Sequence, residues 1–122
     1  MCTRTVLRRE WREFLRGFSR KHSGWLVAIE TYDLETGETV ISRLARLESV
    51  ELDLEDKKNP RINVIVRDDH KEIKRILFRP SDLMLQLSEN GNDAALRIVS
   101  VNTVTSVRLR VAASPELVDG VA

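Results

Sequence analysis

The stretch from residue 7 to residue 29 most constrains the fold, because its hydrophobic period changes at Gly24. Before this glycine, the apolar side chains fall at i, i+4, i+7, i+8 and i+11, on one stripe of an α-helix. These residues are Leu7, Trp11, Phe14, Leu15 and Phe18. After it, apolar residues alternate with the two-residue period of a strand. The sequence predicts an amphipathic helix, capped at its start by Thr3 or Thr5, that leads directly into a β-strand.

Residues 25–111 keep the two-residue period of β-strands, interrupted by short polar turns. Val50, Leu52 and Leu54, for example, alternate with acidic residues, so that one face of this strand is apolar and the other is acidic. One helix followed by roughly seven or eight short strands predicts a mainly β (α+β) fold. We expect the N-terminal amphipathic helix to pack on an antiparallel β-meander that forms a small barrel or a strongly curled sheet.

The length of 122 residues indicates one domain. We assign a single globular domain to residues 1–111, with the helix at about residues 5–23, and a flexible C-terminal tail to residues 112–122. The single cysteine, Cys2, cannot form an intramolecular disulfide, and no apolar run approaches the roughly 20 residues that cross a bilayer. We therefore expect a soluble, cytoplasmic protein.

The run WREFLRGFSRKHSGWLV, at residues 11–27, resembles the opening of a small bacterial family known as a numbered domain of unknown function. Its members share the motif WxxFxxxFSxxHxGW, followed by a β-rich region. The resemblance extends loosely over residues 11–110 and includes Pro80 and the approach to the last strands at residues 90–96. Where the family pattern has an Asp-Gly turn before the final strand, this chain has Asn102 and Thr103. The resemblance implies a helix followed by strands, and it implies no activity.

Few residues are of the kinds that carry catalysis or bind metals. His22 falls in the last turn of the predicted helix, where an imidazole can reach free backbone carbonyls and a cationic ring favours the helix dipole. The five glycines lie too far apart to form a phosphate-binding loop. The densest set of metal-ligand side chains falls in a predicted turn, where consecutive residues rarely converge on one ion: Asp68, Asp69, His70 and Glu72. We expect no catalytic residue, no metal and no cofactor, and we predict that the protein is not an enzyme.

The predicted helix carries the clearest charge pattern of the chain. Residues 1–24 contain seven Lys and Arg residues against two Glu residues. Four of the arginines recur at every fourth position and so share one helix face: Arg8, Arg12, Arg16 and Arg20. Such a face can contact an anionic partner. Because Glu10 and Glu13 interrupt it, we expect it to be mainly a solvated surface.

These observations favour a non-enzymatic binding or scaffolding domain of a soluble bacterial protein. The alternative is a nucleic-acid-binding module that uses the arginine face of the helix. The partner is an unidentified protein or a second copy of the chain, since a sheet that does not close leaves an edge free for pairing. A membrane is not expected, because the β-rich remainder has few large side chains and needs the aromatic stripe of the helix for its core.

Overall fold

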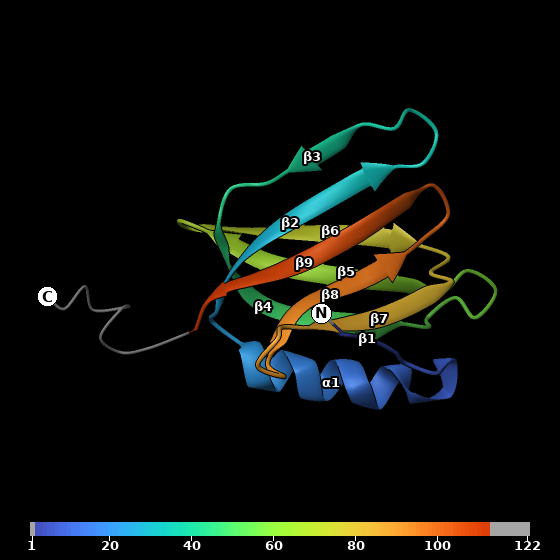
Figure 1. The fold of residues 1–122 in the computed structure, drawn as a ribbon. Helices are drawn as coiled ribbons and strands as arrows, with labels where there is room; N and C mark the ends of the chain where they lie inside the picture. Colours follow the sequence, from blue (N-terminus) through green and yellow to red (C-terminus); the bar gives the residue numbers. More distant parts are fainter. Residues whose placement is uncertain (1, 113–122) are drawn as a thin grey trace, which may run out of the picture.

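The computed structural model describes residues 2–112 and has an α+β fold, with one α-helix packed on a nine-stranded antiparallel sheet (Figure 1). The elements in chain order are β1 (Cys2–Thr5), the 3₁₀ helix η1 (Arg8–Glu10), α1 (Trp11–His22), β2 (Leu26–Asp33), β3 (Thr39–Ile41), β4 (Ala45–Asp53), β5 (Arg61–Asp68), β6 (Lys71–Phe78), β7 (Asp82–Leu87), β8 (Asp93–Val99) and β9 (Thr103–Val111). The prediction of one N-terminal helix followed by antiparallel strands is confirmed.

The sheet is open, neither closed into a barrel nor strongly curled, so that part of the prediction is wrong. Its strand order is β1-β7-β8-β9-β2-β4-β5-β6, with β3 paired to β2, and β1 and β6 form the two ends. The sheet has two halves, β1-β7-β8-β9-β2 and β4-β5-β6, which within residues 2–112 are joined only between β2 and β4. This connection is short, because it consists of the pairs Leu26 with Arg46 and Val27 with Ala45. From Glu30 onward, β3 takes that edge of β2. The two halves therefore separate instead of continuing into a cylinder.

Residues 2–5 form a strand, whereas the sequence predicted the beginning of the helix there. Cys2–Thr5 pairs antiparallel with β7, and the N–H of Val6 extends this pairing with a 2.9 Å bond to the carbonyl of Leu83. Thr3 and Thr5 are therefore strand residues and cap nothing. Threonine suits a strand well. Hydrogen bonds to the backbone edge of β7 stabilise residues 2–5 as a strand more than the first turn of a helix would.

The aromatic stripe of α1 is part of the core, as predicted for most of its members. Trp11, Leu15 and Phe18 are buried, and Phe14 packs against the same cluster from a partly exposed position. Leu7 is the exception, since 49% of it is exposed. It precedes η1, and the neighbouring Val6 takes the inward position instead. The apolar cluster also includes residues of β2 and of β4–β9, so α1 closes one side of a common core.

The turns follow their sequence signals. Gly24 has the positive φ expected of a helix-ending glycine, at 84°. In the turn after β2, Asp33 Oδ1 accepts the backbone N–H groups of Glu35 and Thr36. The following strand, β3, is short, with three residues. Of the predicted tail at 112–122, all but residue 112 lies outside the described residues.

The strand order of the sheet ends in β1 on one side and in β6 on the other. β6 carries the exposed charged side chains of Lys71, Glu72 and Lys74. Charged side chains on an edge strand oppose pairing with another chain. Within residues 2–112, α1 has 12 residues and no helix has the length and apolar character that crossing a membrane requires.

Candidate functional site

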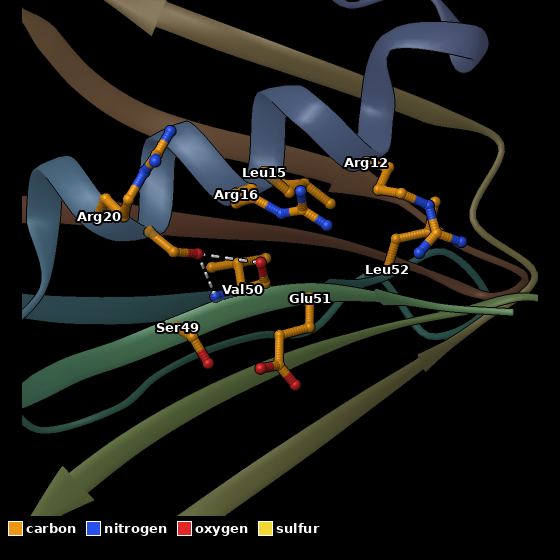
Figure 2. Close-up of a pocket in the computed structure, with 9 residues that line it drawn as sticks. Arg12, Leu15, Arg16, Arg20, Ser49, Val50, Glu51 and Leu52 are labelled. Carbon is orange, nitrogen blue, oxygen red and sulfur yellow. Dashed lines mark hydrogen bonds between the residues drawn. The ribbon is translucent and has the colours of Figure 1, made fainter. Parts of the chain in front are cut away.

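A groove lies between α1 and β4, and we call it the arginine groove (Figure 2). Its volume is about 370 Å³, in the lower part of the range of small-ligand pockets. Leu15, Val50 and Leu52 give it an apolar floor. Its full lining is Arg12, Leu15, Arg16, Ser19, Arg20, Ser49, Val50, Glu51 and Leu52.

Ser19 joins the two walls of the arginine groove. Its hydroxyl oxygen accepts the backbone N–H of Val50 at 2.8 Å and donates to the carbonyl oxygen of Val50 at 3.0 Å. One side chain therefore satisfies both backbone groups of a residue at the edge of β4. These two hydrogen bonds, together with the burial of Leu15 and Val50, fix the helix beside the strand. Sequence reasoning assigned no role to Ser19, although it is a fixed residue of the WxxFxxxFSxxHxGW motif.

Three of the four predicted arginines line this groove. Arg12, Arg16 and Arg20 are solvent-exposed, and the part of the chain that the structure describes offers none of them an ion pair. In Figure 2, Arg12 and Arg16 extend toward the space beside β4, whereas the guanidinium group of Arg20 turns away from the strand. Arg8 lies elsewhere: it donates to the carbonyl of Pro80 at 3.1 Å and covers the ring of Trp11.

The acidic residues that were expected to interrupt the arginine face lie outside the groove lining. Glu10 is the N-cap residue of α1, and Glu13 lines a separate hollow with Phe14 and Leu85 on another side of the helix. Glu51 does line the groove, but its carboxylate points away from α1 in Figure 2. The positive charge of Arg12 and Arg16 is therefore not neutralised by these three carboxylates.

His22 lies at the end of α1, as predicted, and is fully enclosed, with only 1% of it exposed. Its Nδ1 lies 2.9 Å from the carbonyl oxygen of Phe18, and its ring contacts the rings of Phe18 and Trp25. Its Nε2 lies 3.3 Å from Asp93 Oδ2, without the alignment of a hydrogen bond. Lys21 binds the same carboxylate oxygen at 3.2 Å. These contacts of His22 and Lys21 with Asp93 link the end of α1 to β8, so we assign them a structural role.

Burial lowers the pKa of His22 from 6.5, against the raising effects of the Phe18 carbonyl and Asp93. Because the unfolded chain then binds the proton more tightly, we expect the free energy of unfolding to fall as the pH drops below about 6.5, by at most about 1.4 kcal/mol per pH unit. This loss ends at the lower pKa of the folded state. Urea denaturation at pH 7.5 to 5 would measure it, and His22→Gln should abolish it. His70→Gln, in an exposed turn, is the matched control; a rise in stability toward acid would mean that Asp93 dominates.

The predicted turn with the densest set of metal-ligand side chains, at residues 68–72, lies between β5 and β6. Asp69 adopts a positive φ of 56° at its tip, and Glu72 pairs with Arg67 across the hairpin at 3.5 Å. Among residues 2–112, no three His, Cys, Asp or Glu side chains converge in a way that could hold a metal ion. We take the arginine groove as the candidate site, because three of the predicted arginines line it.

The fold and the groove define a class: a small α+β domain with a cationic groove between its helix and a strand of its open sheet. The chain belongs to the Family of unknown function (DUF5335), whose family model matches residues 2–116. This match confirms the resemblance noted at the WxxFxxxFSxxHxGW motif. No curated protein and no solved structure matched the chain in the same comparisons.

Proposed function

We propose that the protein is a non-enzymatic binding domain and that the arginine groove is its binding site for an anionic partner. The observation that carries this proposal is the position of Arg12 and Arg16. Their side chains extend over the groove, and no carboxylate within residues 2–112 pairs with them. Two exposed cations held over one hollow favour an anion there.

The chemistry of the groove supports binding over catalysis. A guanidinium group stays charged at neutral pH, so it does not serve as a general acid or base, but its planar fork matches carboxylate and phosphate groups. The apolar floor of Leu15, Val50 and Leu52 lowers the local dielectric constant, which strengthens a charged contact made above it.

Fluorescence anisotropy with labelled poly-L-glutamate at about 50 mM salt tests this proposal. We expect binding that weakens as salt rises, because exposed charges are screened. The double variant Arg12→Glu with Arg16→Glu should bind at least about tenfold more weakly. The matched control is Arg9→Glu with Arg43→Glu, which changes the net charge equally at exposed positions outside the groove. Equal losses in both variants, or no binding by the native protein, would contradict the proposal.

The alternative is a nucleic-acid-binding module that uses the same arginines. Two phosphate contacts would give a slope of about −1.4 to −1.8 in log K against log salt. We expect oligonucleotides of equal charge to bind more weakly than polyglutamate, because none of the described residues that line the groove is aromatic and available for base stacking. Tighter binding of single-stranded or duplex DNA, lost in the Arg12→Glu and Arg16→Glu double variant, would favour the alternative.

A further inference from the structure

Among residues 2–112, β4 pairs with another strand on the side that faces the arginine groove only at Ala45 and Arg46. Leu47 uses this edge to bond the backbone of Gly24 and Trp25, at 2.7 and 2.8 Å. A bulge follows between Leu47 and Ser49, and the next edge residue, Val50, is satisfied by Ser19.

Antiparallel strands turn alternate residues toward the same edge. The N–H and C=O groups of Leu52 therefore point to the same side as those of Val50, which is the side away from β5. Across residues 2–112, neither a strand pairing nor a side-chain bond reaches Leu52 on this side. The groove therefore contains a free donor and a free acceptor of a β-strand.

The arginines opposite this edge have the spacing of a strand. Residues four apart on a helix are separated by about 6 Å along its axis. Alternate residues of an extended chain are separated by about 6.6 Å and point to one face. Arg12 and Arg16 can therefore meet two acidic side chains at positions i and i+2 of an extended peptide.

The face of β4 that points away from α1 disfavours an acidic residue at position i+1 of such a peptide, between the two acidic residues at i and i+2. The side chains of Ser49 and Glu51 point away from α1 (Figure 2). A strand added beside β4 would place its intervening side chain on this face. A carboxylate there would lie near the carboxylate of Glu51, and like charges at neighbouring strand positions are destabilising.

Resting on the proposed function, we propose that the anionic partner is an extended acidic peptide that adds as a strand to the free edge of β4 at Leu52. Its alternate Glu or Asp side chains bind Arg12 and Arg16, and its intervening residues are uncharged or basic. The peptide residue opposite Leu52 exchanges two backbone hydrogen bonds with it, as in an antiparallel pair. Recognition through added strands takes affinity from the main chain and specificity from alternate side chains.

Two labelled hexapeptides of equal composition test the proposal: Glu-Thr-Glu-Thr-Glu-Thr and Glu-Glu-Thr-Thr-Glu-Thr. Only the first places carboxylates two residues apart. We expect the alternating peptide to bind at least about tenfold more tightly by anisotropy, which corresponds to one charge-assisted contact. The same peptide N-methylated at its three Glu residues keeps all its charges but loses the donors that would face Leu52, and it should lose this advantage.

Amide hydrogen exchange provides a readout on the protein. Saturating alternating peptide should slow exchange of the Leu52 amide and leave the Val50 amide unchanged, because Ser19 already binds the latter. Arg12→Gln and Arg16→Gln should each weaken binding, whereas Arg9→Gln, outside the groove, should not.

The outcomes separate the two proposals. Equal binding of both hexapeptides and of the N-methylated form, with polyglutamate still dependent on Arg12 and Arg16, would overturn strand addition and leave an anion site. Tighter binding by oligonucleotides than by the alternating peptide would also overturn it. Failure of polyglutamate to bind would overturn both proposals.

Discussion

Trp11→Ala should lower the free energy of unfolding by about 3–5 kcal/mol, as large-to-small changes at buried aromatic residues do. Only 2% of Trp11 is exposed. Its Nε1 also donates to the carbonyl of Val6 at 2.9 Å, which ties the start of the helix to the chain arriving from β1. The substitution therefore removes core volume and leaves a buried carbonyl without a donor. Urea denaturation of the native and variant proteins measures the loss.

Leu7→Ala is the matched control, because Leu7 belongs to the same sequence stripe but is 49% exposed. We expect a loss below about 1 kcal/mol, since most of this side chain is already in water. A small loss at Trp11, or equal losses at both positions, would mean that α1 is not packed on the sheet as described. The pair therefore tests where the stripe enters the core.

The helix and most of the strands could be predicted because their signals are local. The 3.6-residue period of Trp11, Leu15 and Phe18 requires only that one helix face is buried. The start of the helix was harder to predict from the sequence. Nothing within residues 2–5 indicates the edge of β7, to which they pair, and that edge lies some eighty positions further along the chain.

Closure of the sheet could not be predicted, because it depends on contacts between distant strands. Alternation indicates that a strand has a buried face, but it does not indicate how many residues pair with each neighbour. Here β2 holds β4 through two residue pairs and then pairs with β3. That exchange opens the sheet, and it also leaves the edge of β4 free beside α1.

Only part of the candidate site could be predicted from the sequence. The spacing of Arg12, Arg16 and Arg20 predicted a shared face, which the structure confirms for these three by placing them along one groove. Arg8 could not be separated from them, since only the fold shows that it binds Pro80. The free edge at Leu52 depends on the bulge in β4, which has no clear sequence signal, and on the bond from Ser19 to Val50. The motif marks Ser19 as a fixed residue but does not indicate its partner.

Thr105→Val should raise the free energy of unfolding by about 1–2 kcal/mol, opposite in sign to most core substitutions. Thr105 lies in β9 opposite Thr31 and is fully buried. Its hydroxyl group finds no hydrogen-bond partner among the residues that the structure describes. A buried hydroxyl without a partner costs its full desolvation energy, whereas a methyl group of similar size costs none.

The matched control for this variant is Thr103→Val in the same strand. The hydroxyl of Thr103 lies 2.8 Å from that of Ser100 across the β8–β9 turn, so we expect this change to lower stability by about 0.5–1.5 kcal/mol. Thermal and urea denaturation of the two single variants would show shifts of opposite sign. A loss of stability in Thr105→Val would mean that its hydroxyl is bonded in solution, with water in the adjoining groove of Thr31, Arg75 and Thr103 as the partner.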